Sequence, residues 1–63
     1  MKEYVVQFFA DVGMKWITLS YCARHPFKTE ESARRNLLLH QSEHPEIRYR
    51  ILVRTVTEWE ELV

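Results

Sequence analysis

Few residues in this sequence can cross-link the chain or set sharp turns. Its 63 residues include one cysteine, one glycine and two prolines. Because Cys22 has no second cysteine to pair with, no disulfide bond can form within the chain, and a lone thiol is typical of a reduced cytosolic protein. So short a chain lies near the lower limit at which one hydrophobic core holds a fold. We therefore expect a single domain over residues 1–63 that needs a second source of stability.

Long apolar runs and a net charge are also missing. No stretch of about 20 apolar residues is present to span a bilayer, and Met1–Glu3 leads directly into a strand-like pattern rather than the apolar core of a signal peptide. We expect a soluble, cytoplasmic protein without a membrane partner. Nine basic and nine acidic residues cancel, so the chain lacks the strong positive field of proteins that coat nucleic acid nonspecifically.

Motifs that support catalysis are absent as well. The chain has no Gly-rich phosphate loop, no Ser-His-Asp arrangement in a strand-turn-helix setting, and no paired carboxylates outside its acidic last six residues. Cys22 and His25 form a possible thiolate pair, but catalysis also needs an orienting third group and a pocket that excludes water. A sheet with one helix offers little concavity. The sequence therefore predicts a non-enzyme without a cofactor.

Four side chains raise the question of a metal site. Two residues separate Cys22 from His25, and three separate His40 from His44, which superficially matches the loop and helix halves of a zinc finger. The first pair is not the usual two cysteines on a tight hairpin, however, and His44 lies at the predicted helix end beside Pro45. We expect no bound metal and ordinary surface histidines, since a partly protonated imidazole is favourable near a helix C-terminus.

The first half of the chain predicts a β-hairpin. Residues 3–9 and 15–21 are rich in aromatic and β-branched residues, and they flank Gly13, which can take the positive φ that a short hairpin loop with a bulge requires. Residues 22–27 are expected to be irregular because Pro26 keeps the residue before it out of helical geometry.

The second half predicts one helix. It is expected over residues 30–42, with Thr29 as its N-cap, two glutamates in its first turn and Pro45 after its end. Spacings of three and four residues predict an inward ridge. The residues of this ridge are Ala33, Leu37, Leu38 and Gln41.

After the helix, residues 47–57 alternate as a strand with one buried side. The fold class is therefore α+β, a small ββαβ domain whose three-stranded sheet, antiparallel or mixed, has one helix packed on one face. We favour the third strand beside the first and antiparallel to it, with pairing to the second as the alternative. The residues after about 57 are expected to fray or to dock through Trp59, and the spacing of Thr57 and Glu60 leaves a short helix open.

Alternation along the strands divides the side chains between two faces. The face toward the helix is expected to carry Tyr4, Val6, Phe8, Ile17, Leu19, Tyr21, Ile47, Tyr49, Ile51 and Val53. The opposite face is expected to carry Val5, Gln7, Phe9, Trp16, Thr18, Ser20, Arg48, Arg50, Leu52 and Arg54. Aromatic residues and arginines are interleaved on this second face.

Three interpretations of the second face remain open. Aromatics and arginine are common anchors of protein interfaces, and they also form platforms on which single-stranded RNA stacks. In the third interpretation the arginine stems cover the aromatics and keep their charged heads in water. We favour a protein interface, either a homodimer formed by the same face of two copies or a complex with another protein. The predicted partner-binding residues are Phe9, Trp16, Arg48, Arg50, Leu52 and Arg54.

The ending "YRILVRTVTEWEE", which follows a helix closed by "HPE", resembles that of short uncharacterised ββαβ accessory proteins of bacteriophages, prophages and some actinobacteria. The resemblance implies a small protein that binds and inhibits a host protein, including components of host defence systems, in the cytoplasm of the host bacterium. We interpret the chain as such an interaction module. The alternative is a single-stranded nucleic-acid-binding module that uses the same face.

Overall fold

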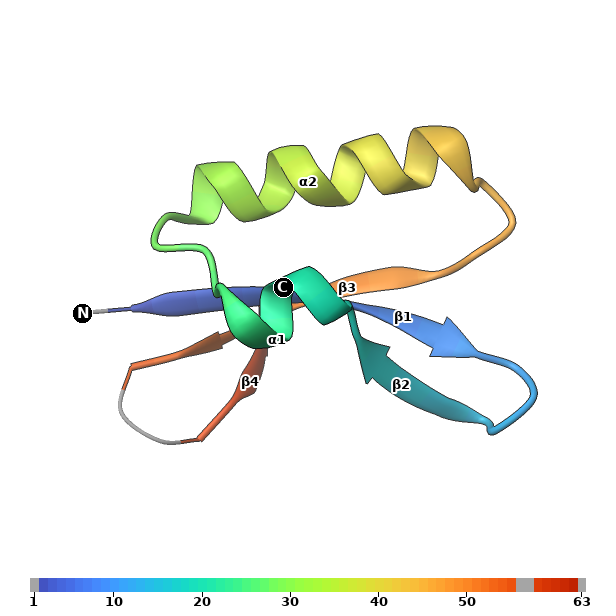
Figure 1. The fold of residues 1–63 in the computed structure, drawn as a ribbon, viewed down its shortest axis with the longest axis horizontal. Helices are drawn as coiled ribbons and strands as arrows, with labels where there is room; N and C mark the ends of the chain where they lie inside the picture. Colours follow the sequence, from blue (N-terminus) through green and yellow to red (C-terminus); the bar gives the residue numbers. More distant parts are fainter. Residues whose placement is uncertain (1, 56–57, 63) are drawn as a thin grey trace.

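The computed structural model describes residues 2–55 and 58–62 and shows a four-stranded antiparallel sheet with one long helix lying along one face (Figure 1). The elements are β1 (Glu3–Ala10), β2 (Lys15–Thr18), α1 (Ser20–Arg24), α2 (Glu30–Glu43), β3 (Tyr49–Arg54) and β4 (Glu60–Leu62). The strand order is β2-β1-β3-β4. The favoured prediction, with the strand after the helix lying antiparallel beside the first strand, is confirmed. Among the described residues, no helix is long and apolar enough to cross a membrane.

The core is centred between β1, β3 and α2, and it continues around β1 through Val5 and through Cys22 of α1. β1 is the central strand, paired with β2 over residues 7–10 and with β3 over residues 3–8. In this register Val6 lies opposite Ile51, and both side chains are buried in one cluster with Ala33 of α2. The buried residues of the cluster are Tyr4, Val5, Val6, Cys22, Ala33 and Ile51. So few buried side chains make the fold sensitive to any loss of core volume.

The predicted number of three strands is wrong, because the tail adds a fourth. β4 pairs antiparallel with the outer edge of β3 and places Leu62 opposite Ile51, where Leu62 packs against the core. An unpaired strand edge offers backbone N–H and C=O groups, so three tail residues gain partners there that a free tail lacks. β3 itself ends at Arg54, and the predicted continuation to Thr57 runs into residues 56–57, which lie outside the described residues.

The second predicted strand is also too long. β2 ends at Thr18, and residues 20–24 form the short helix α1 instead of strand and irregular loop. The amide of Leu19 still donates to the carbonyl of Val6, after which the chain leaves the sheet and returns at Phe27, which exchanges two backbone hydrogen bonds of 2.8 Å with Tyr4. Tyr21, predicted to be in the core, therefore lies on α1 with its side chain exposed.

The helix α2 begins and ends close to its predicted limits. Its N-cap is Thr29, whose hydroxyl accepts a hydrogen bond of 3.2 Å from the amide of Ser32. The predicted ridge is only partly correct. Leu38 is 63% exposed. It follows Ala33 by five residues, which places it about 140° around the helix axis from that buried side chain. Gln41 is exposed as well. The half-buried positions of α2 are Ser32, Asn36, Leu37 and His40.

The positive φ in the hairpin loop falls on Met14, at 52°, and not on Gly13 as predicted. A left-handed backbone costs a residue with a Cβ roughly 1–2 kcal/mol. Met14→Gly is therefore expected to raise the free energy of unfolding by about 0.5–1 kcal/mol after the extra entropy of glycine in the unfolded chain is subtracted. Urea unfolding followed by circular dichroism measures the change.

Gly13→Ala is the matched control for this loop. A Cβ at residue 13 meets only the flexible side chain of Lys15, at 3.1 Å. We expect a change below about 0.5 kcal/mol. A loss of stability in Met14→Gly would contradict the strain assigned to that residue.

Candidate interaction surface on the open sheet face

The sheet face away from α2, which we call the open face, carries alternate side chains of the three longer strands. The register places Phe9 opposite Trp16, Val5 opposite Leu52, and Gln7 between its neighbours on β2 and β3. The open-face residues are Glu3, Val5, Gln7, Phe9, Trp16, Thr18, Arg48, Arg50, Leu52 and Arg54. The six predicted partner-binding residues share this face, and their binding role stays a prediction.

Guanidinium groups cover the aromatic rings at one end of the open face. The guanidinium carbon of Arg48 lies 4.4 Å from the centroid of the Phe9 ring, and that of Arg50 lies 4.4 Å from the Trp16 ring. The two rings meet edge to face, with centroids 5.3 Å apart. These distances are within the range of cation–π attraction. In the isolated chain the arginines thus cover the aromatics, but their guanidinium groups lie on the rings, where the third interpretation expected the stems to lie with the charged heads in water.

A polar network crosses all four strands in the middle of the open face. The Oε1 atom of Gln7 accepts a hydrogen bond of 2.8 Å from Nε of Arg50, and its Nε2 atom donates one of 3.0 Å to Thr18. Nη1 of Arg50 lies 3.2 Å from Oε1 of Glu61 on β4. The charge of Arg50 is therefore balanced by the chain's own tail.

A second charged group lies at the other end of the face. Nη2 of Arg54 is 2.8 Å from Oε1 of Glu3, and Nζ of Lys28 is 3.1 Å from Oε2 of the same carboxylate. Hydrogen bonds from Arg54 and then Lys28 hold the pKa of Glu3 below its ordinary value. Arg54 also lies over the ring of Trp59, at 4.5 Å from the centroid. Two cations thus share one carboxylate, which leaves one net positive charge.

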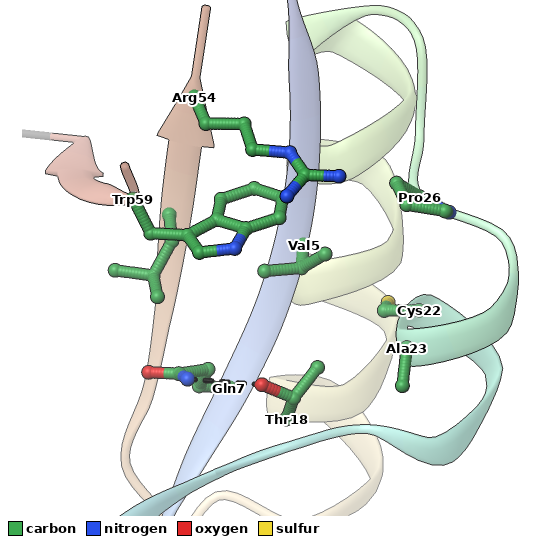
Figure 2. A pocket seen from close by; sticks show the side chains of 9 residues that line it. Val5, Gln7, Thr18, Cys22, Ala23, Pro26, Arg54 and Trp59 are labelled. Carbon is green, nitrogen blue, oxygen red and sulfur yellow. Dashed lines mark hydrogen bonds between the residues drawn. The ribbon is translucent and has the colours of Figure 1, made fainter. Parts of the chain in front are cut away.

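A hollow of about 270 Å³ opens between α1 and Trp59 (Figure 2). Figure 2 shows the Trp59 ring beneath the Arg54 guanidinium on one side, and Pro26 and Ala23 on the other. The hollow is lined by Val5, Gln7, Thr18, Cys22, Ala23, Pro26, Leu52, Arg54 and Trp59. Five separate parts of the chain meet there, so the hollow exists only in the folded protein.

Cys22 lies at the edge of this hollow and is 1% exposed. Burial raises the pKa of its thiol, and a hydrogen bond with the backbone of Val6 offsets part of that rise. The thiol therefore stays protonated at neutral pH and is a poor nucleophile. This arrangement gives no support to the thiolate pair with His25, which stands exposed beyond the end of α1.

The raised pKa of Cys22 has a consequence for stability against pH. The unfolded chain releases the thiol proton near the ordinary cysteine value of about 8.5, while the native chain still holds it. The free energy of unfolding is therefore expected to fall as the pH rises through this range. Cys22→Ala is expected to reduce that slope. Urea unfolding between about pH 7 and about pH 10 measures it, and equal slopes in both proteins would contradict the assignment.

The four side chains considered for zinc lie in different parts of the structure. The ring of His25 lies 5.5 Å from that of Tyr21, and the ring of His40 lies 5.7 Å from that of Tyr49 on the α2 face. The Nδ1 atom of His44 lies 3.7 Å from Oε1 of Glu46. Within residues 2–55 and 58–62, no group of three or more histidine, cysteine or acidic side chains is placed to hold a metal ion. Folding without metal stays a prediction.

Sequence reasoning expected the tail to fray or to dock through Trp59, which packs against the core, but it did not place Trp59 or Glu61 on the open face. The signal was present, since strand alternation in the tail turns Glu61 toward Arg50 and Leu62 toward the core. The lining contributed by Ala23 and Pro26 had no such signal, because it depends on the unexpected helix α1. Comparisons with protein-family models, curated proteins and solved structures found no match to the chain. The resemblance to short phage proteins therefore stays a hypothesis.

Proposed function

We propose that this chain is a protein-interaction module whose open face binds another protein. The observation that carries the proposal is the row of arginine–aromatic stacks beside a hollow on one sheet face. Such side chains are the usual anchors of protein interfaces. The stacks also hold the aromatic rings in fixed positions before binding, which lowers the entropy lost when a partner packs on them.

The geometry favours a protein partner over nucleic acid. Arg50 is paired with Glu61, so its charge is largely matched before any phosphate arrives. A base that stacks on Phe9 must also displace the guanidinium of the arginine above it. The net charge of zero adds no long-range attraction for a polyanion.

On the resemblance of the ending to phage accessory proteins, we further propose that the partner is a protein of a bacterial host and that binding inhibits it in the host cytoplasm. A component of a defence system belongs to this class of target. A second copy of the chain is the other occupant that suits the same face, since self-complementary packing is common in small proteins.

Affinity capture from bacterial extract tests the open face. The chain should retain a specific protein, Phe9→Glu should lose it, and Leu38→Glu on the exposed side of α2 should keep it. Circular dichroism must show that both variants fold. Loss with Leu38→Glu and retention with Phe9→Glu would contradict the proposal.

Two further measurements separate the other occupants of the face. Titration with single-stranded RNA and DNA at low salt is expected to show no binding tighter than about micromolar, and tight, salt-sensitive binding lost in Arg50→Glu would replace the proposal with the nucleic-acid function. Light scattering across a dilution series reports the mass. A mass near 7.7 kDa at tens of micromolar contradicts a homodimer.

A further inference from the structure

The hollow on the open face has the size and walls of an anchor pocket. Its volume of about 270 Å³ is below the range of about 300–1,000 Å³ typical of pockets for whole small molecules. It therefore suits one large side chain rather than a cofactor. Its lining is almost evenly polar and apolar. The apolar part is contributed by Val5, Ala23, Pro26, Leu52 and the ring of Trp59.

The polar groups that line the hollow include one charged side chain. Among the described residues that line it, only Arg54 is charged. Gln7 and Thr18 already hydrogen-bond to each other at 3.0 Å, and Cys22 is buried beside Val6. An occupant therefore meets apolar side chains, the paired polar groups of Gln7 and Thr18, and a single charged group, the Arg54 guanidinium.

That guanidinium is not fully neutralised. The carboxylate of Glu3 pairs with two cations. Its Oε1 atom lies 2.8 Å from Nη2 of Arg54, and its Oε2 atom lies 3.1 Å from Nζ of Lys28. The three groups carry one net positive charge, and the Arg54 side chain remains about one-third exposed. An incoming carboxylate balances this charge without displacing Glu3.

We infer that the hollow binds a segment of the partner protein in which an aromatic or branched apolar side chain stands next to an acidic residue. The apolar side chain fills the space between Val5, Leu52 and Pro26, and the acid pairs with Arg54. This inference rests on the proposed function and names the chemistry that the partner presents to the open face.

The chain's own tail shows that the open face accepts this chemistry. Trp59 stacks beneath Arg54, and Glu61, two residues later, pairs with Arg50. A partner segment with an apolar anchor and an acid repeats these two contacts in the neighbouring hollow. A protein segment also fits better than a free acid, because an extended chain that leaves the hollow continues over Phe9 and Arg48 on the same face.

Nuclear magnetic resonance titration of the full chain tests the inference with the blocked dipeptide acetyl-Trp-Asp-amide. The expected result is a set of saturable shifts at Ala23, Leu52 and Trp59, with a dissociation constant of the order of 1 mM or tighter. Acetyl-Trp-Asn-amide, which lacks the charge, should bind about fivefold more weakly, and acetyl-Ala-Asp-amide should not saturate. Equal binding of the Asp and Asn probes would overturn the pairing with Arg54.

Titration with free indole-3-acetate distinguishes a peptide-binding site from a site for a small aromatic acid. If it binds at the hollow more tightly than the dipeptide, the site belongs to a free aromatic acid and the inference is wrong. Weaker binding supports the peptide.

Ala23→Leu fills the mouth of the hollow from α1 and is expected to weaken dipeptide binding at least about tenfold. Leu38→Ala, on the far side of the molecule, is the matched control and should leave binding unchanged. If Ala23→Leu does not fold, the comparison of Asp and Asn probes on the unmodified chain still decides.

Partner capture separates this inference from the proposed function. Capture lost in both Phe9→Glu and Ala23→Leu supports both proposals. Capture kept in Ala23→Leu but lost in Phe9→Glu would overturn the hollow and leave the proposed function standing. Capture kept in both variants would overturn the function itself.

Discussion

Ile51→Ala is expected to lower the free energy of unfolding by about 2–4 kcal/mol, the cost of deleting a large buried aliphatic side chain. Ile51 is 4% exposed on β3 and lies between Val6 of β1 and Leu62 of β4. A core of this size supplies no more than about 3–5 kcal/mol in total. The variant is therefore expected to be largely unfolded at room temperature.

Ile17→Ala is the matched control, because it makes the same change on the edge strand β2. Ile17 is 36% exposed and lies opposite Phe8 near the hairpin, so its truncation is expected to cost less than about 1 kcal/mol. Urea unfolding followed by circular dichroism measures both variants. Equal losses would contradict the position of the core between β1, β3 and α2.

Arg50→Glu is expected to lower the free energy of unfolding by about 1–3 kcal/mol, because Arg50 links its own strand β3 to the other three strands. The change removes the hydrogen bond to Gln7 and the stack on Trp16, and it sets two carboxylates against each other at Glu61. A part-buried donor to Gln7 is also lost, so the cost exceeds that of a surface ion pair alone.

Exchanging the charges of residues 50 and 61 measures how much of this loss in the free energy of unfolding comes from the ion pair. Adding Glu61→Arg to Arg50→Glu is expected to restore about 0.5–1 kcal/mol at low salt, less at high salt because the pair is part-exposed. Arg34→Glu on α2 breaks an exposed pair with Glu30 and should cost less than about 1 kcal/mol. Equal costs for Arg34→Glu and Arg50→Glu would show that the network on the open face adds nothing to stability.

The parts of the fold that follow from local chemistry were predictable. The hydroxyl of Thr29, two acidic residues and the proline after His44 define α2 closely. Alternation in residues 3–9 and 47–54 assigned the faces of β1 and β3, and the return path through the helix favoured the observed strand order. These signals come from residues that are close together in the sequence, so they can be recognised from one sequence alone.

The parts that depend on tertiary contacts were not predictable. The helix α1 has five residues, too few to form alone, and it is held by contacts of Cys22 and Phe27 with β1. β4 needs the free edge of β3 before three residues can act as a strand. Leu37 and Leu38 are adjacent, so the apolar pattern alone could not tell which one faces the sheet.

The same distinction applies to the candidate surface. The six predicted residues share one face because alternation fixes it, but their mutual contacts were left open among three interpretations. The structure places Arg48 and Arg50 over rings and pairs Arg50 with the tail. Phe9 and Trp16 are therefore not bare rings that a second copy of the chain must cover, and the stacks suit the rigid docking surface that we propose.

Photocrosslinking in bacterial cells tests the interaction role of the open face most directly. A benzoylphenylalanine side chain is placed at position 48, above Phe9 on the open face, or at position 38, on the exposed side of α2. We expect a discrete crosslinked product with a second protein from position 48 and none from position 38. A product from position 38 alone, or from neither position, would contradict the assignment of the open face as the interaction surface.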